Sequence, residues 1–249
     1  MALSVVPNDR ASWLKGPQAN CSIPPAAPAR AWRLVLLGAP GVGKGTQAEM
    51  LHAQLIACHL STGDVFRAAR QVPQCERTPA INEALDHMRR GELVPDATVL
   101  AIVRERARCL RCGGFLLDGF PRTVPQAEAL EQLLSSLQGP LDAVVSYELP
   151  IDQIVARLSG RRTCPACKGV YHVSARPPAV AETCDHCGVK LHQREDDRPE
   201  AVRARMETYA TNTAPLAAFY EERGLLVRVP ADGAPAVIFE RTVSALHGR

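Results

Sequence analysis

The sequence feature that most constrains the fold is the glycine-rich segment Gly38-Ala-Pro-Gly-Val-Gly-Lys-Gly-Thr46, which directly follows the short apolar run Arg33–Leu37. It matches the pattern G-x-x-x-x-G-K through Lys44, and a helical pattern begins at Gln47. Its internal glycines let successive backbone N–H groups turn toward phosphate oxygens, while the helix N-terminus and Lys44 add positive charge. An ordinary strand-to-helix turn would not need a lysine at this offset. The segment therefore predicts a polyphosphate-binding loop between a strand and a helix.

Four short apolar runs, separated by segments of helical period, predict the fold class. They are Arg33–Leu37, Gly114–Leu117, Leu141–Tyr147 and Leu225–Val229. Such alternation is typical of an α/β domain in which helices flank a parallel sheet. A chain of 249 residues with 46% apolar side chains can bury the core of one such domain. One segment departs from this rhythm, because Cys164–Leu191 is rich in Gly, Pro, Cys and His and reads as a small β insertion.

Charge and hydropathy exclude several classes of function. The formal net charge is only +3, and no run of five or more Lys and Arg offers a track for nucleic acid. No apolar stretch approaches the roughly 20 residues that cross a bilayer, so we expect no membrane segment. Residues 1–31 contain five prolines without a sustained period and are expected to form a loose extension, with a transit peptide as the alternative.

Two C-x-x-C pairs within the β insertion predict a metal site. Cys164-Pro-Ala-Cys167 and Cys184-Asp-His-Cys187 are separated by sixteen residues, a spacing within the range of four-thiolate zinc sites. The loop between them has too few large apolar residues to fold unaided. With four protein ligands, such a zinc ion would be structural. Paired cysteines in a long chain without the apolar segment of a signal peptide also favour a reducing cytoplasm over a disulfide scaffold.

Two arginines and one aspartate have the chemistry that phosphoryl transfer requires. Arg67 and Arg122 carry planar guanidinium groups that grip phosphate oxygens in pairs, and both are expected to hold an acceptor phosphate. Asp118 ends the apolar run Phe115-Leu-Leu-Asp, which would deliver its carboxylate to the mouth of a parallel sheet. A carboxylate in that place suits the organisation of magnesium.

Four segments in this order resemble the adenylate kinase family. They are the glycine-rich loop, Leu60-Ser-Thr-Gly-Asp-Val-Phe-Arg67, Gly91-Glu-Leu-Val-Pro-Asp96 and Leu117-Asp-Gly-Phe-Pro-Arg-Thr-Val-Pro-Gln126, and the likeness runs from about Arg33 to the C-terminus. With its cysteine pairs, the chain is similar to the long-lid members that carry a zinc knot. The resemblance implies the reversible, Mg²⁺-dependent reaction ATP + AMP = 2 ADP, serving nucleotide homeostasis in the cytoplasm, and a monomeric enzyme.

The resemblance also implies an organisation for residues 32–249. A core of residues 32–60, 92–157 and 195–249 would carry a mobile helical NMP-binding lobe at about 61–91 and a small β zinc-binding lid at about 158–194. The family holds magnesium largely through water, a role that falls here to Asp118, and Thr46 replaces the hydroxyl that usually follows the loop lysine. Between Arg67 and Gly91 the chain departs from the family's shorter helix pair, which leaves acceptor affinity open.

The resemblance assigns further residues by position. Catalysis is expected of Lys44, Arg122, Arg157, Arg161, Arg194 and Arg205, the last four converging on the transferred phosphoryl group when the lid shuts. ATP is expected to bind at Gly41, Val42, Gly43, Lys44, Gly45, Thr46, Arg157, Arg161, Val170 and Tyr171. AMP is expected to bind at Thr62, Arg67, Glu92, Leu93, Val94, Gly119, Arg122, Gln126, Arg194 and Arg205, with Gln126 as the hint for adenine.

Several alternatives stay open at this stage. Taken alone, Thr62 would serve as a helix cap for the segment starting at Asp64, and Gln126 as a solvated helix residue. A kinase that uses GTP or accepts another monophosphate is the nearest rival, and a zinc-ribbon module with a nucleotide switch is the rival from another class. A second site built from Cys75, Cys109 and Cys112 is the weaker reading of the remaining cysteines.

Overall fold

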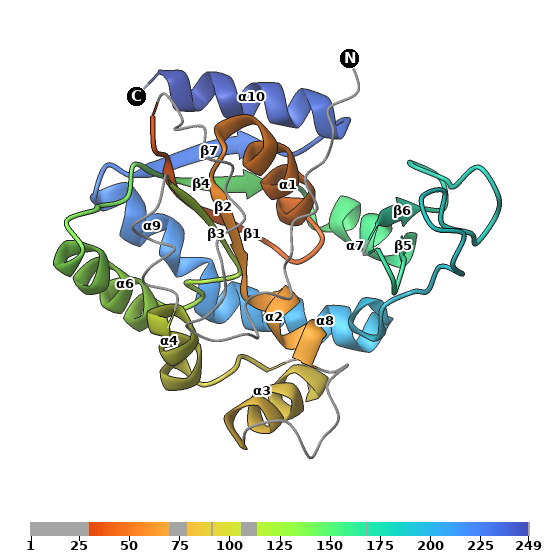
Figure 1. The fold of residues 1–249 in the computed structure, drawn as a ribbon, viewed down its shortest axis with the longest axis horizontal. Coiled ribbons are helices and arrows are strands. Elements are labelled where there is room, and N and C mark those ends of the chain that lie inside the picture. The colour runs from red at the N-terminus through yellow and green to blue at the C-terminus, as the bar shows by residue number, and fades with distance from the viewer. Residues whose placement is uncertain (1–29, 70–78, 91, 106–113, 168, 249) are drawn as a thin grey trace.

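A parallel sheet of five strands lies at the centre of the computed structural model, which describes residues 30–69, 79–90, 92–105, 114–167 and 169–248 (Figure 1). The strand order is β2-β3-β1-β4-β7, and every neighbouring pair is parallel. The strands are β1 (Arg33–Gly38), β2 (Cys58–Ser61), β3 (Phe115–Asp118), β4 (Ala143–Glu148) and β7 (Leu226–Pro230). The predicted α/β class is confirmed, and each of the four predicted runs forms a strand.

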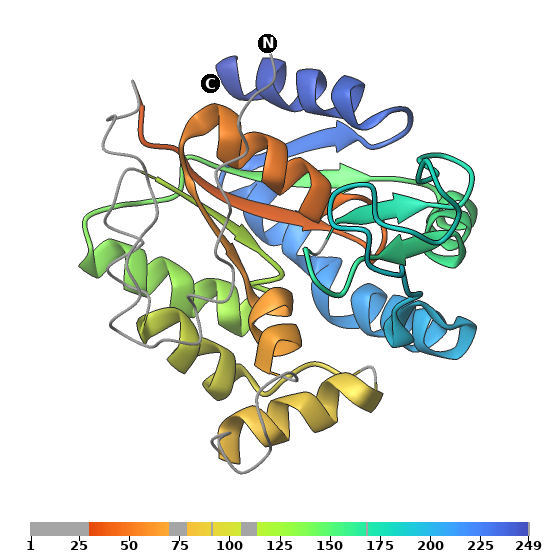
Figure 2. The same ribbon diagram turned by 45° about the vertical axis from the view of Figure 1, so that its right-hand side comes forward.

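Alternate side chains of the strands pack against two layers of helices (Figures 1 and 2). Leu34 and Leu36 of β1 face a core shared with α1 (Lys44–Leu55) and α10 (Pro235–His247). Val35 and Leu37 face the opposite core, which is the larger. That core includes side chains of α2 (Thr62–Ala69), α3 (Pro79–Arg90), α4 (Asp96–Glu105), α6 (Val124–Ser136) and α9 (Pro215–Glu222). Burial on both faces explains why the strands read as continuous apolar runs.

The carboxyl ends of β1, β2 and β3 meet at one edge of the sheet. The register places Leu36 and Ser61 opposite Asp118, on either side of β3. The glycine-rich segment that ends at Thr46, here called the phosphate loop, follows β1 at this edge, and α2 follows β2 there. The predicted site residues of three segments therefore lie along the same edge of the sheet. The helix after the loop begins at Lys44, three residues earlier than the pattern from Gln47 indicated, because Gly43 in the left-handed region ends the turn.

The β insertion forms a small antiparallel sheet of its own. Strands β5 (Arg161–Thr163) and β6 (Val170–His172) pair directly after α7 (Ile151–Ser159), and Figure 1 shows them beyond the end of that helix, outside the central sheet. The chain returns through η3 (Glu195–Asp197) and α8 (Pro199–Thr208). A π-helical turn, η4 (Tyr209–Thr213), then joins α8 to α9.

Some predictions fall on residues outside this description. They concern the extension up to residue 29, the cysteines Cys75, Cys109 and Cys112, and the side chain of Arg67, of which only the backbone in α2 is described. Within the described residues, no helix combines the length and apolar character that a membrane span needs.

Candidate active site

The phosphate loop turns through Gly43, which has φ 110° and caps the N-terminus of α1. This left-handed conformation favours glycine and aims the first amides of the helix back into the loop. The ammonium of Lys44 donates hydrogen bonds to the carbonyl oxygens of Gly38 and Ala39, at 2.6 and 3.1 Å. The Lys44 side chain therefore folds back toward the start of the loop.

The surroundings of Lys44 disfavour the charged form of its side chain. Burial lowers its pKa to about 8, and the nearby guanidinium groups of Arg122, Arg205 and Arg161 act in the same direction, while Asp118 opposes them. The Asp118 carboxylate also lies close to Gly45, since a Cβ built on that glycine would come within 3.8 Å of its Oδ2. Lys44, Gly45 and Asp118 therefore lie close together.

His59 of β2 is a neighbour of Asp118 that sequence reasoning missed. Its Nε2 lies 3.6 Å from Oδ2 of Asp118, and its side chain is fully buried. Burial by itself raises the pKa of Asp118, but the His59 ring and the Lys44 charge hold it below its ordinary value. Asp118 thus stays ionised beneath the phosphate loop. Its position next to the recognised Leu60-Ser-Thr-Gly segment was the one signal for His59.

One cavity collects most of the residues predicted to bind AMP. Its lining includes Thr62, Glu92, Leu93, Val94, Gly119, Arg122 and Gln126, joined by Gly63, Phe66, Met88 and Val99. Thr62 does not cap α2, because Ser61 accepts the hydrogen bond from the Asp64 amide and the Thr62 hydroxyl donates to the Gly119 carbonyl at 2.9 Å. The helix-cap reading of Thr62 is therefore wrong.

Gln126 is buried in the lining of this cavity, and both ends of its side-chain amide are hydrogen-bonded within the protein. It is 2% exposed, so the alternative of a solvated helix residue is also wrong. Its Oε1 accepts a 2.7 Å hydrogen bond from the Arg122 amide, and its Nε2 donates a 2.5 Å hydrogen bond to Oδ1 of Asp96. Asp96 additionally accepts from the Thr123 hydroxyl at 3.1 Å. Asp96 was part of a recognised segment, but nothing in the sequence paired it with Gln126.

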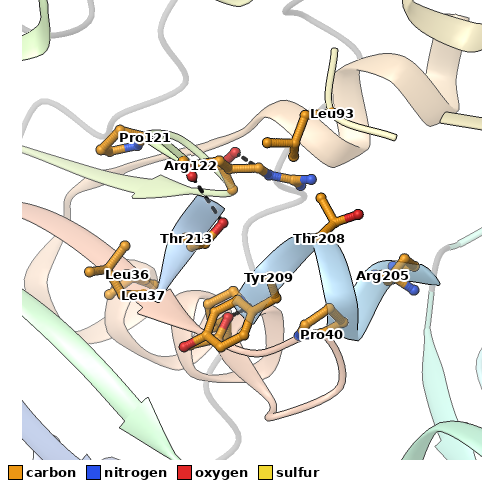
Figure 3. Close-up of a pocket in the computed structure, with 13 residues that line it drawn as sticks. Leu36, Leu37, Pro40, Leu93, Pro121, Arg122, Arg205, Thr208, Tyr209 and Thr213 are labelled. Carbon is orange, nitrogen blue, oxygen red and sulfur yellow. Dashed lines mark hydrogen bonds between the residues drawn. The ribbon is translucent and has the colours of Figure 1, made fainter. Parts of the chain in front are cut away.

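A second cavity adjoins the first and reaches the phosphate loop (Figure 3). Lys44, Gly38 and Pro40 line it on the loop side, and Arg205, Thr208, Tyr209 and Thr213 line it from α8 and η4. Leu93, Gly119 and Arg122 line both cavities. Figure 3 shows the Arg122 side chain extending between Leu93 and Thr208. The three residues from α8 and η4 other than Arg205 were not predicted, because no motif marks them.

Backbone and side chain of Arg122 are both anchored. Its Nε donates to the Gly119 carbonyl at 2.8 Å, and its own carbonyl accepts from the Thr213 hydroxyl at 2.9 Å. Gly119 has φ 83°, and a Cβ there would meet Oγ1 of Thr62 at 2.8 Å and Nη2 of Arg122 at 3.2 Å. The close approach of these two side chains therefore requires glycine between them.

The structure does not bring all the predicted arginines to one point. Arg205 lines the second cavity and pairs with Asp196 at 3.1 Å. Arg161 donates from Nε to the buried Asp197 at 2.7 Å and makes a second hydrogen bond to the same carboxylate. Arg194 donates to the hydroxyl of Thr163 at 3.0 Å.

Arg157 joins the phosphate loop to the loop after β7. Its guanidinium donates to the carbonyls of Val42 and Ala231, at 3.0 and 2.8 Å. Val170 and Tyr171 lie in β6, away from the linings of both cavities. Tyr171 is only 7% exposed, and its hydroxyl contacts Sγ of Cys184 at 3.4 Å while accepting from the Asp185 amide at 2.9 Å.

The four cysteines of the β insertion form one cluster. Their Sγ atoms all lie within 4.8 Å of one another. A tetrahedral zinc ion with Zn–S bonds of about 2.3 Å needs sulfurs about 3.8 Å apart, so the cluster fits such an ion. The Tyr171 hydroxyl lowers the pKa of Cys184 to about 6, whereas burial raises the pKa of Cys167 in the same cluster. Among the described residues, this cluster contains cysteines alone.

Comparisons with known proteins agree with this geometry. The family model described as adenylate kinase matches residues 36–225. An adenylate kinase of Carboxydothermus hydrogenoformans is 44% identical over 216 residues, covering 86% of this chain and 99% of the relative. An adenylate kinase of Syntrophotalea carbinolica is 51% identical over 195 residues, covering 78% and 88%. One of Bacillus licheniformis is 48% identical over 197 residues, covering 79% and 89%.

Proposed function

The chain belongs to the adenylate kinase family, and on this premise we propose that the two adjoining cavities hold the two nucleotides of its reaction. The chain is a nucleoside monophosphate kinase, a phosphotransferase, and it catalyses ATP + AMP = 2 ADP. The cavity next to the phosphate loop receives the phosphates of ATP, and the cavity lined by Gln126 receives AMP.

The observation that carries this assignment is the position of Arg122. Arg122 lines both cavities. Its side chain donates to the Gly119 carbonyl, and its backbone is held by hydrogen bonds with the side chains of Gln126 and Thr213. A guanidinium group held between donor and acceptor can contact the phosphates of both and neutralise the charge that develops in transfer. No other described cationic side chain lines both cavities.

The remaining residues have roles that follow from their positions. Lys44 leaves its carbonyl partners and binds the phosphates of ATP, which the backbone of Gly41, Gly43 and Gly45 also contacts. Asp118 would hold Mg²⁺ through water, and the ion would neutralise phosphate charge. The backbone of Glu92, Leu93 and Val94 lines the base of AMP, with Gln126 reading it.

The arginines of the lid region act when the lid, at about residues 158–194, closes. Phosphate oxygens would compete with the carboxylate of Asp196 for Arg205, which lines the cavity next to the phosphate loop, and with the carboxylate of Asp197 for Arg161. Arg67, Arg157 and Arg194 complete the set that we assign to binding. Closure of the lid would also exclude the water that competes with AMP for the phosphoryl group.

Zinc is the metal that best suits the cysteine cluster. Four thiolates at these separations match its tetrahedral preference, and no fifth protein ligand is needed. Among the described residues between 161 and 191, the buried side chains are those of Cys164, Tyr171, Cys184 and Leu191, so a bound metal would supply the stability that this small core lacks.

A monomer working in the cytoplasm, without nucleic acid or membrane partners, completes the proposal. The near-neutral charge and the free thiols of the described cysteines support it. Light scattering tests the monomer against the chain mass of 26.9 kDa.

An acceptor panel tests the assignment of the cavities. Product formation is measured with ATP and, in turn, AMP, CMP, UMP and GMP, and then with GTP and AMP, while zinc is quantified in the same sample. We expect AMP with ATP to be the preferred pair. Equal rates with every monophosphate would contradict the role of Gln126, and nucleotide binding without multiple turnover would contradict the catalytic roles.

A further inference from the structure

The amide of Gln126 is held in one orientation by two partners of opposite character. The Arg122 N–H can only donate, so the atom that faces it at 2.7 Å is Oε1. The Asp96 carboxylate can only accept when ionised, so the atom that faces it at 2.5 Å is Nε2. Both ends of the amide give the same answer. A flipped amide would set its NH₂ against an N–H and its oxygen against a carboxylate.

Asp96 is itself fixed in place. It is the first residue of α4 and joins this helix to the start of α6 through Gln126 and through the Thr123 hydroxyl, at 3.1 Å. Thr123 also caps α6, because its hydroxyl oxygen accepts a hydrogen bond from the backbone N–H of Gln126 at 3.3 Å. The carboxylate is therefore tied to a rigid helix start, and it cannot follow the Gln126 side chain if the amide rotates.

A fixed amide discriminates between bases that a free amide would not. Gln126 uses one of its two Nε2 hydrogens and one lone pair of Oε1 within the protein, which leaves one donor and one acceptor for a ligand. Adenine offers an amino donor at position 6 beside a ring-nitrogen acceptor, the pair that a glutamine amide matches. A 6-oxo purine places an acceptor where adenine has its donor. A rotatable amide would turn over to meet it.

We propose that Asp96 is a specificity-determining positioning residue, which locks the Gln126 amide in the orientation that accepts 6-amino purines and rejects 6-oxo purines. The inference rests on the proposed role of Gln126 in contacting the base of AMP. Asp96 itself touches no substrate in this scheme.

The experiment compares AMP with IMP, whose bases differ only in the 6-amino against the 6-oxo group and the N1 proton. The ratio of kcat/KM for AMP to that for IMP is measured in the wild type, Asp96→Asn, Gln126→Met and the double variant. We expect Asp96→Asn to lower this ratio about 10-fold, the worth of one hydrogen bond to a charged group. In the Gln126→Met background, Asp96→Asn should leave the ratio unchanged, because no amide remains to be oriented.

The outcomes separate the proposal from its premise. An Asp96→Asn enzyme that loses activity toward AMP and IMP equally keeps the wild-type ratio, and this would overturn the proposal by showing a merely structural role. A Gln126→Met enzyme that keeps the wild-type ratio would overturn the premise that Gln126 reads the base. If Asp96→Asn does not fold, the ratio of kcat/KM for AMP to that for IMP is measured in Asp96→Ser, which retains a polar side chain at the helix start.

Discussion

The side-chain hydroxyl of Thr213 donates a 2.9 Å hydrogen bond to the backbone carbonyl of Arg122, across 91 positions of sequence. Thr213 is the last residue of the π-helical turn η4, whose wider winding follows directly on α8. Arg205 of α8 and Thr213 of η4 line the same cavity. The π-turn thus links α8 to the arginine that we place between the nucleotides.

Removal of this hydrogen bond should impair catalysis more than stability. Thr213→Val keeps the shape of the side chain and loses the donor, so we expect kcat/KM for AMP to fall about 5-fold, the worth of one neutral hydrogen bond. Thr213→Ser keeps the donor and serves as the matched control. Steady-state kinetics measures the effect, and a valine variant as active as the serine variant would show that the contact does not position Arg122.

The depressed pKa of Lys44 predicts a proton uptake on ATP binding. In the free enzyme the pKa is about 8, so at about pH 8.5 roughly three-quarters of the side chains are neutral. The negative phosphates raise this pKa, and binding therefore draws a proton from solution. Above pH 8, KM for ATP should rise with pH.

Calorimetry in two buffers of different ionisation enthalpy measures this uptake at about pH 8.5. The matched control is Lys44→Arg, whose guanidinium stays charged throughout and should bind ATP without buffer-dependent heat. Identical heats for the wild type in both buffers would contradict a titrating Lys44.

Lys44 and Arg122 should be the most costly side chains to remove. Because each places a charge where phosphate charge develops, we expect Lys44→Ala or Arg122→Ala to lower kcat about 10²- to 10³-fold. Zinc content should stay at the wild-type value, since the cysteine cluster lies outside both cavities. Turnover is followed as ADP formation beside metal analysis, and near-normal rates in either variant would refute the assignment.

Loss of a cysteine ligand should unfold the lid locally. Cys164→Ser should release zinc and make residues 164–191 the first site of proteolysis, because the buried set there is too small to stay ordered without the metal. Cys58→Ser in β2, outside the cluster, is the matched control and should retain its metal. Full metal content in Cys164→Ser, by atomic absorption, would contradict the four-thiolate site.

The fold was predictable where sequence pattern and local geometry coincide. Four strands appear as apolar runs, but β2 escaped because its four residues, Cys58–Ser61, run directly into the Thr62 helix start and leave no separate period. The start of α1 was placed three residues late, because a glycine-rich loop hides the first helical turn, which contains Lys44.

The site was predictable as a set of residues but not as a network. Motifs named Gln126 and Arg122, yet the partners that fix them, Asp96 and Thr213, come from helices that pack together only in the folded chain. Hydrogen bonds across tens of residues leave no periodic trace. For the same reason the pairing of Arg161 with Asp197, 36 positions apart in the sequence, could not be foreseen.

The glycine at position 119 lies on the wall between the two cavities, with Thr62 on one side and Arg122 on the other. Any side chain at this point would displace both neighbours at once. Mutation here cannot trade donor affinity against acceptor affinity, since both halves would be damaged together. A change that alters the affinity for one nucleotide alone would instead have to fall on a residue that lines a single cavity.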